Sequence, residues 1–243
     1  MNAGRTARER ARSELTREIK AAARRQLATE GAERLSLRAI ARELGMVSSA
    51  LYRYFPSRDD LLTALIIDAY DALGTAAESA AAKTEAAAGD HWHPLTSWLA
   101  VCTAVRDWAR ANPHEYALIY GSPVTGYQAP QTTVQPASRV PILMLGLLSR
   151  AHAEGWLAPL DSGSEVAGVL ADQVDILAEL APGVPRQALL RVAIAWTQLF
   201  GMISFELFGQ LVGTMDPADE FFTAATRQMA EFIGLRKHAG VGA

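Results

Sequence analysis

The chain has 243 residues, of which 50% are hydrophobic, so it can bury one large core or two smaller ones. Its single cysteine, Cys102, excludes an intramolecular disulfide framework and cannot form a zinc site by itself. The arginine-rich N-terminus lacks the apolar segment of a secretory signal, and polar residues interrupt the hydrophobic runs. These features predict a cytoplasmic protein that does not span a membrane.

Charge is distributed unevenly along the chain, although the net charge is only −3. Residues 1–60 contain 13 Lys and Arg against 8 Asp and Glu, whereas residues 61–243 contain 10 against 18. A basic head on an acidic body is typical of a protein that meets nucleic acid through the head alone.

The first predicted elements are an arm and a helix. Residues 1–11 are expected to form a flexible basic arm, whose arginines serve either solubility or contact with a minor groove or phosphate. A helix is then predicted over residues 12–30, because apolar side chains recur every four positions from Leu15 to Leu27. This helix would support the elements that follow.

Two short helices joined by a tight turn are predicted over residues 37–55. In the first, apolar residues recur at i, i+3, i+4 and i+7 from Leu37, directly after an N-cap at Ser36. Gly45 follows the last of them, where helices commonly end with positive φ, and Ser48 offers a second N-cap. The pattern indicates a helix-turn-helix.

The second of these helices has an inner and an outer face. Leu51 and Phe55 lie together and face the first helix, so Ser49 and Arg53 point outward. Small and hydroxyl side chains followed by a guanidinium suit the major groove, where a recognition helix meets base edges. The alternative is an ordinary helical hairpin with a solvated face, but the spacing of caps, glycine and tyrosines favours DNA binding.

A connecting segment follows over residues 58–90. Pro56 ends the second helix, and Ser57 with Asp60 forms a start similar to a capping box. The alanine-rich stretch 76–89 is expected to fade from helix into a domain boundary. The domains predicted are therefore a helix-turn-helix domain over residues 12–57, this connection, and a second domain over residues 91–243.

The second domain is predicted to be helical throughout. Its helices are expected over residues 94–112, 114–120, 137–154, 164–180, 186–212 and 217–233. Residues 121–136, with three prolines and two glycines, are expected to be a loop and a disordered insertion. Because no strand-period alternation or repeat occurs, the predicted fold is all-α, with an N-terminal three-helix domain joined by a linking helix to a larger helical domain.

Nothing in the sequence predicts catalysis. His91 and His93 lie two apart with no carboxylate or cysteine at ligand spacing, which favours a polar cap over a metal site. There is no nucleophile elbow and no phosphate loop, and Asp172 and Asp175 suit solvent or a pocket rim more than acid–base work. We therefore expect no enzyme, no cofactor and no metal.

Residues 15–73 resemble the N-terminal domain of the tetracycline-repressor-like (TetR/AcrR) family, through the segments LSLRAIARELGM, ALYRYF and PSRDDLL. The resemblance implies a DNA-binding transcriptional regulator. Carried over by position, it implies that phosphates or groove edges contact Ser36, Arg38, Tyr52, Tyr54 and Arg58. It also implies that Ser48, Ser49, Ala50 and Arg53 face the bases.

The body carries a mostly aromatic set that we predict to line a ligand site: Trp98, Cys102, Tyr116, Tyr120, Met144, Asp172 and Trp196. Such stripes usually form core, but loosely matched helices can enclose a cavity of about 300–1,000 Å³ for a small apolar ligand. The body resembles the ligand-sensing domain of a TetR subgroup named for a Trp-His-Gly pattern, through ANPHEYALIYGSP and AWTQLFGMISFELFG. Trp196 and Gly201 match that pattern, whereas Phe200 replaces the histidine.

The stretch 192–212 is apolar nearly all round, which favours a surface covered by a second copy over a central helix of a monomer. The predicted dimer interface comprises Trp196, Gly201, Phe205, Phe208, Gly209, Phe222 and Phe232. Together these features predict a homodimeric repressor that binds double-stranded operator DNA and is released by a small apolar or amphipathic effector. The alternatives are a DNA-binding regulator without an effector and, third, a helical small-molecule carrier or enzyme.

Overall fold

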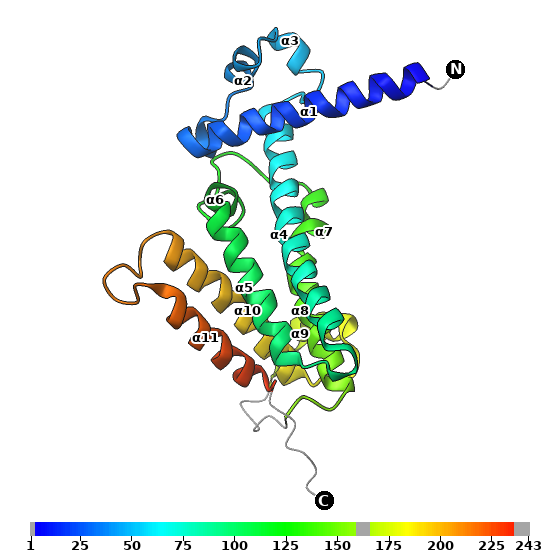
Figure 1. The fold of residues 1–243 in the computed structure, drawn as a ribbon, viewed down its shortest axis with the longest axis vertical. Helices are drawn as coiled ribbons and strands as arrows, with labels where there is room; N and C mark the ends of the chain where they lie inside the picture. The colour runs from blue at the N-terminus through cyan, green and yellow to red at the C-terminus, as the bar shows by residue number, and fades with distance from the viewer. Residues whose placement is uncertain (1–2, 159–165, 236–243) are drawn as a thin grey trace, which may run out of the picture. The chain divides into compact units, whose positions relative to one another are not determined.

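The computed structural model describes residues 3–158 and 166–235, and helices dominate this part of the chain (Figure 1). Its α-helices are, in order, α1 (Ala3–Glu30), α2 (Leu37–Glu43), α3 (Ser48–Leu51), α4 (Arg58–Ala88), α5 (Pro94–Ala111), α6 (Pro113–Tyr120), α7 (Val134–Ala137), α8 (Arg139–Ala153), α9 (Val169–Leu180), α10 (Arg186–Leu207) and α11 (Ala218–Ile233). Short 3-10 helices stand at Ala32–Arg34 (η1), Gly89–His91 (η2) and Gln131–Thr133 (η3). The all-α prediction is confirmed.

The chain divides into two compact units, and their boundaries differ from the domains expected above. Unit 1 comprises Met1–Tyr70 and Asn112–Pro136, and unit 2 comprises Asp71–Ala111 and Ala137–Ala243. The helix α4 therefore begins in unit 1 and ends in unit 2. The segment that contains α6 belongs to unit 1, although the sequence had assigned it to the body.

Unit 1 has a core built from the apolar stripes of its helices. Its fully or nearly fully buried members are Ile19, Ala22, Ala23, Leu27, Leu35, Leu37, Ile40, Ala41, Leu51, Phe55, Leu61, Leu62, Leu65 and Ile66. Most of them stand at the i, i+3 or i+4 spacing that places side chains on one face of a helix. Each stripe is thus satisfied by packing against its neighbours within the unit.

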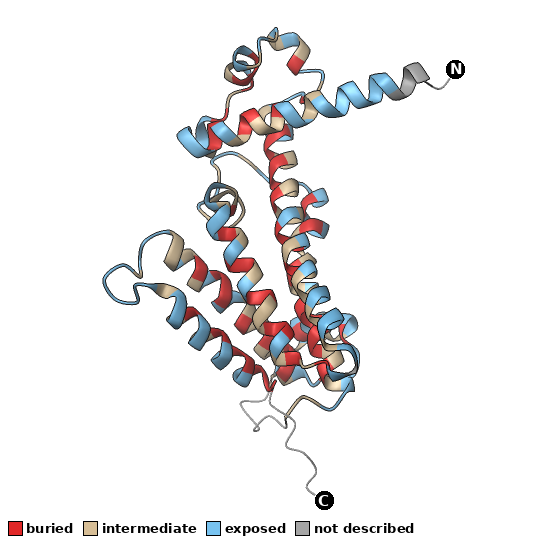
Figure 2. Cartoon of the chain, in the orientation of Figure 1, coloured by how far each residue is buried: buried red, intermediate tan, exposed pale blue. Residues whose placement is uncertain are grey.

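Two helices are longer than the sequence predicted. The first begins at Ala3 rather than at residue 12, and α4 continues to Ala88 through the alanine-rich stretch that was expected to fade. Alanine, arginine and glutamate have high helix propensity, so these stretches stay helical although few of their side chains are buried (Figure 2). The expected flexible arm is therefore helical from Ala3 onward.

Residues 121–136 are anchored in unit 1, whereas we had expected a disordered insertion. The Tyr127 hydroxyl lies 2.8 Å from the Thr63 hydroxyl on α4, and the Thr125 backbone N–H donates to the Glu33 carboxylate at 2.8 Å. The end of the segment forms η3 and the start of α7. Proline and glycine prevent one long helix here, but they do not prevent these tertiary bonds.

Unit 2 packs α10 and α11 against α5, with α8 and α9 against α10. The Trp98 indole N–H on α5 donates to the Thr226 carbonyl on α11 at 2.9 Å. Arg106, also on α5 and almost fully buried, forms two 2.7 Å bonds to Glu206 and an ion pair of 2.7 Å to Asp219. These charge-assisted bonds tie α5 to both ends of the connection between α10 and α11.

The helix α10 ends at Leu207, five residues before the predicted end, and a turn with Gly209 at φ 82° and Gly213 at φ 77° follows. Among the described helices, α10 alone is long and apolar enough to cross a membrane. Length and apolar composition alone do not indicate a membrane span, since the core helix of a soluble protein has the same properties. The start of the predicted helix over residues 164–180 lies outside the described residues, and α9 is seen from Val169.

Candidate nucleic-acid interface

The helix-turn-helix begins with a capped and buttressed α2. Ser36 is its N-cap, and the Ser36 hydroxyl accepts a 3.4 Å hydrogen bond from the Ala39 N–H. The buried Gln26 side chain on α1 accepts from the Ser36 N–H at 3.0 Å and donates to the Arg34 carbonyl at 3.4 Å. The start of α2 is thereby fixed to α1, by a glutamine that the sequence analysis did not single out.

The turn between α2 and α3 has the conformation that its glycine predicts. Gly45 has φ 66°, and the Met46 N–H donates to the Ala41 carbonyl at 2.8 Å. The N-cap of α3 is Val47 in an extended conformation, without a side-chain cap, so Ser48 is the first helical residue rather than the predicted cap. The shift is one residue and leaves the Ser48 hydroxyl without a capping role.

The recognition helix α3 is shorter than expected, with four residues followed by a hydrogen-bonded turn. The N–H groups of Tyr54 and Phe55 both donate to the Leu51 carbonyl, at 2.8 and 3.1 Å. Leu51 is fully buried and Phe55 nearly so, which orients the element as the sequence predicted. Consequently Ser49, Tyr52 and Arg53 are exposed, whereas Ser48 and Ala50 are half-buried beside them.

Some of the residues predicted to contact phosphates are exposed, whereas others contact protein groups instead. Arg38 on α2 and Tyr52 are exposed. Tyr54 packs against the core, with the Arg12 guanidinium 5.8 Å from its ring centroid. Arg58 donates from one nitrogen to the Ala32 carbonyl at 2.9 Å and to the Glu33 carbonyl at 3.3 Å, so it holds η1 in place.

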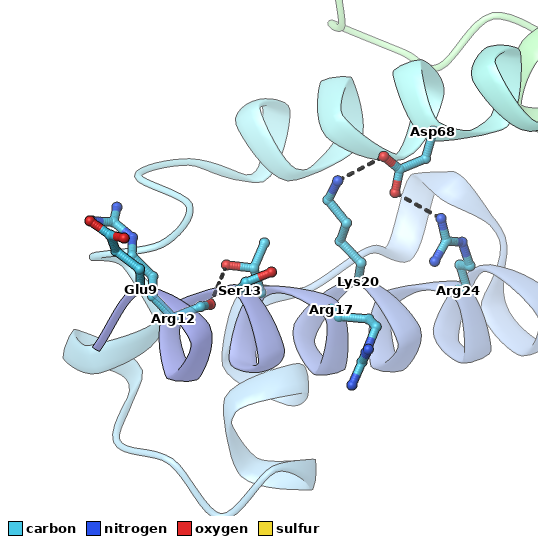
Figure 3. A pocket seen from close by; sticks show the side chains of 8 residues that line it. Glu9, Arg12, Ser13, Arg17, Lys20, Arg24 and Asp68 are labelled. Atoms are coloured by element: carbon cyan, nitrogen blue, oxygen red, sulfur yellow. Dashed lines mark hydrogen bonds and ion pairs between the residues drawn. The ribbon is translucent and has the colours of Figure 1, made fainter. Parts of the chain in front are cut away.

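The basic side chains of α1 form a groove with α4 (Figure 3). Asp68 accepts from Lys20 at 2.7 Å and from Arg24 at 2.8 Å, and the groove has a volume of about 530 Å³. Arg24 also lies 3.5 Å from Glu115 on α6. Lys20 and Arg24 therefore hold α1 against α4 and α6.

A further ion pair joins α1 to the helix-turn-helix. Two nitrogens of Arg25 donate to one carboxylate oxygen of Glu43 on α2, at 2.9 and 2.6 Å. Both side chains are largely exposed, so the pair orients α2 more than it stabilises the fold. In the sequence, the only signal for this ion pair is that Arg25 and Glu43 lie on two neighbouring predicted helices.

The predicted ligand-lining residues do not come together in one unit. Tyr116 and Tyr120 belong to unit 1, where Tyr120 lies edge to face with Tyr70 at 6.0 Å, and desolvation raises the pKa of both Tyr70 and Tyr120. In unit 2, Trp98, Cys102 and Met144 are at most 2% exposed. Asp172 is exposed on α9, and Trp196 lies on α10 with its ring 6.0 Å from that of Phe200.

The predicted dimer residues lie mainly on α10 and α11. Gly201, Phe205 and Phe232 line an apolar groove of about 570 Å³ between these helices, together with Met202, Leu211, Phe221 and Met229. Phe205 is 57% exposed, and Phe208 and Gly209 are exposed in the turn after α10. Phe222 is instead buried, with the Arg106 guanidinium 4.6 Å from its ring, and Trp196 is half-buried.

Metal ligation has no visible basis in the described part of the chain, where no three His, Cys, Asp or Glu side chains form a group that could hold an ion. His93 accepts a hydrogen bond from the Leu95 N–H at 3.2 Å and packs on Trp156, with ring centroids 4.7 Å apart. This is the polar cap that the sequence favoured at the start of α5.

Two family models match the chain. One, described as bacterial regulatory proteins of the tetR family, matches residues 19–65, and the other, described as the tetracyclin repressor-like C-terminal domain, matches residues 98–229. The Trp-His-Gly subgroup assignment is not confirmed by these matches and stays a prediction.

Relatives and solved structures agree with the family models. HTH-type transcriptional regulators of Mycobacterium tuberculosis and Mycobacterium bovis are both 41% identical over 227 residues, covering 92% of this chain and 94% of theirs. The crystal structure of the regulatory protein SCO4313 is 33% identical with a TM-score of 0.72, and the match covers 92% of this chain and 98% of that one. PfmR from Thermus thermophilus, a TetR family regulator, is 19% identical with a TM-score of 0.58 over 90% of this chain and 99% of its own, which supports the fold alone.

Proposed function

The chain belongs to the TetR family of DNA-binding transcriptional regulators, and from this premise we propose that it is a homodimeric repressor released from its operator by a small molecule. The outer edge of α3 carries this proposal. Ser49 and Arg53 are exposed there because the buried Leu51 fixes the opposite face in the core. A guanidinium on that edge can donate two hydrogen bonds to a guanine in the major groove.

Dimerisation is supported by apolar side chains that a monomer would leave in water. Phe205 on α10 is 57% exposed, Phe232 on α11 is 38% exposed, and both line the groove between these helices. Exposed apolar patches of this kind mark interaction surfaces. Two half-sites about 34–36 Å apart on DNA also require a protein with twofold symmetry.

An effector site in unit 2 is supported by polar atoms that lack partners. The Trp196 indole N–H on α10 and the Ser149 hydroxyl on α8 are buried, and within the described residues neither has a hydrogen-bond partner. An indole N–H can only donate a hydrogen bond, so it could donate one to a carbonyl or another acceptor on a ligand. We propose that Trp196 lines the effector site, with Trp98, Cys102, Met144 and Asp172 as further candidates.

Release from DNA would follow from a shift of α4, which begins seven residues after the end of α3 and ends in unit 2. Only an effector that prefers a state mismatched to the operator can weaken DNA binding. A coupling free energy of about 1–3 kcal/mol between the effector and DNA sites would lower the affinity for the operator roughly 5–150-fold. By reciprocity, operator DNA would weaken effector binding by the same factor.

A regulator without an effector is the second candidate. The burial of Trp98, Cys102 and Met144, each at most 2% exposed, favours it because these side chains already have packed surroundings. Such a protein would use the same DNA-binding unit, and its operator affinity would not respond to metabolites.

Footprinting of the DNA upstream of the protein's own gene, with and without candidate metabolites, tests the proposal. Protection of two half-sites that a metabolite abolishes is expected for the ligand-released repressor. Protection that no metabolite changes would favour the second candidate. Calorimetry of an identified effector, with and without operator, then measures the coupling, and equal affinities would contradict it.

A further inference from the structure

The N-terminal third of α1 does not pack against the core of unit 1. Buried side chains begin only at Ile19, whereas residues 7–14 are all exposed (Figures 1 and 2). The helix has 28 residues and is about 42 Å long, and the exposed residues 7–14 form roughly two of its turns. A helix segment that is exposed on all sides gains little stability from packing within its own unit, so its surface is open to a partner.

The side of this segment that continues the core-facing stripe carries arginines. Arg8 and Arg12 precede Leu15 and Ile19 at i, i+4, i+7 and i+11, so they extend the stripe that packs on the helix-turn-helix. Arg12 lies over the ring of Tyr54, directly after the recognition helix. Arg8 is one turn further out, about 6 Å along the axis, and faces the same way within about 40°.

The Arg8 guanidinium is not held by other side chains of the described residues. Within the described residues no hydrogen bond or ion pair engages it, whereas Arg17 pairs with Glu14 at 3.7 Å, and Lys20 and Arg24 are held by Asp68. An exposed cation on a rigid element, adjacent to an element that enters a DNA groove, is complementary to the phosphates on either side of that groove.

We propose that residues 7–14 of α1 are a second DNA-contacting element, in which the Arg8 guanidinium binds a backbone phosphate that flanks the sequence read by α3. The inference rests on DNA binding by the helix-turn-helix. Because a phosphate carries no base identity, this contact adds affinity for every duplex and leaves the preference for the operator unchanged.

The chain supplies a matched control. Arg10 is also exposed, and no hydrogen bond or ion pair engages it within the described residues, but it lies two residues from Arg8 and therefore points about 200° away, to the opposite side of α1. Arg8→Gln and Arg10→Gln remove the same charge from the same helix. Only the direction of the lost guanidinium differs between them.

The test measures binding to a random-sequence duplex of about 30 base pairs by fluorescence anisotropy between about 50 and 200 mM salt. Loss of one phosphate contact is expected to make the slope of log K against log salt shallower by about 0.9 in Arg8→Gln, which equals about 3.5-fold less loss of affinity over that range. Arg8→Lys should keep most of the wild-type slope, and Arg10→Gln should keep all of it. Circular dichroism verifies that each variant keeps its helix content.

Two outcomes would overturn the inference. An Arg8→Gln slope equal to that of the wild type would show that Arg8 binds no phosphate. Equal changes in Arg8→Gln and Arg10→Gln would show a general effect of charge rather than a directed contact. If instead the wild-type protein binds neither random duplex nor the DNA upstream of its own gene, the proposed function fails first, and the inference fails with it.

Discussion

The Glu33 carboxylate accepts a 2.8 Å hydrogen bond from the backbone N–H of Thr125, a residue 92 positions later in the chain. The carbonyl of the same Glu33 accepts from Arg58 at the start of α4. Glu33 therefore joins three separate stretches of unit 1: η1, the segment after α6, and α4. The bond to Thr125, with the nearby Arg58 charge as a smaller cause, lowers the pKa of Glu33.

The Glu33 bond should make part of the stability of unit 1 depend on pH. Because the pKa of Glu33 is lower in the folded chain than in the unfolded one, its stabilisation is present above the unfolded value of about 4.3 and is lost as pH falls through the folded value. We expect Glu33→Ala to lower the melting temperature near pH 7, and the difference from wild type to shrink at about pH 3. Glu33→Gln keeps an acceptor and should lose less. A difference that is the same at both pH values would contradict this account.

Arg53→Ala should separate specific from general DNA binding. Removal of a guanidinium from the exposed edge of α3 is expected to cost about 1–3 kcal/mol on the operator and less on random DNA, since base contacts carry the specificity. Tyr52→Phe, which changes a neighbouring exposed hydroxyl, should weaken both duplexes alike. Gel-shift competition measures the ratio, and a variant at Arg53 with full operator preference would show that this residue does not face the bases.

Arg58→Ala should behave differently from the other proposed phosphate contacts. Its guanidinium bonds to the Ala32 and Glu33 carbonyls, so truncation leaves these acceptors without a charged donor. Hydrogen bonds to charged groups contribute about 1.5–3 kcal/mol, and the lower end applies here because the side chain is 30% exposed. Urea unfolding should therefore show a loss of stability, whereas unchanged stability with weaker DNA binding would return Arg58 to the phosphate contacts.

Phe205→Lys should disrupt the proposed dimer. The phenyl ring is 57% exposed in the groove between α10 and α11, and a lysine there would place a charge in the surface that we propose a second copy covers. Ile142→Lys is the control, because Ile142 is 49% exposed on α8 and does not line that groove. Sedimentation should show dimers for wild type and Ile142→Lys and monomers or aggregates for Phe205→Lys. A wild-type monomer at micromolar concentration would refute dimerisation.

The reactivity of the Cys102 thiol measures whether solvent can reach the interior around α5. The side chain is fully buried, and desolvation raises the pKa of the thiol, so the reactive thiolate is scarce. We expect no reaction with a disulfide reagent in the native protein and complete reaction in denaturant. Rapid native labelling would mean that a path from solvent reaches α5, and protection of the thiol by a metabolite would then identify Cys102 as part of the effector site.

Much of the helix-turn-helix could be predicted because its signals are local. The Ser36 cap, the positive φ of Gly45 and the burial of Leu51 each depend on residues within one or two turns, and all three appear in the structure. The same reasoning erred at element ends. The first helix starts nine residues earlier than predicted, because the residues before position 12 have high helix propensity, and α3 stops four residues earlier.

What the sequence by itself determined is the all-α class, the helix-turn-helix and the inward side of its two helices, because helix periodicity places these side chains without reference to distant parts of the chain. Only the tertiary structure decided that residues 112–136 belong to unit 1, that Arg58 binds the carbonyls of η1, and that Tyr116 and Tyr120 are separated from Trp98 by unit. The hydrogen bonds behind these relationships join residues 25 to 92 positions apart. Spacing along one chain says nothing about such pairs, since the free energy that brings them together comes from the packing of whole helices.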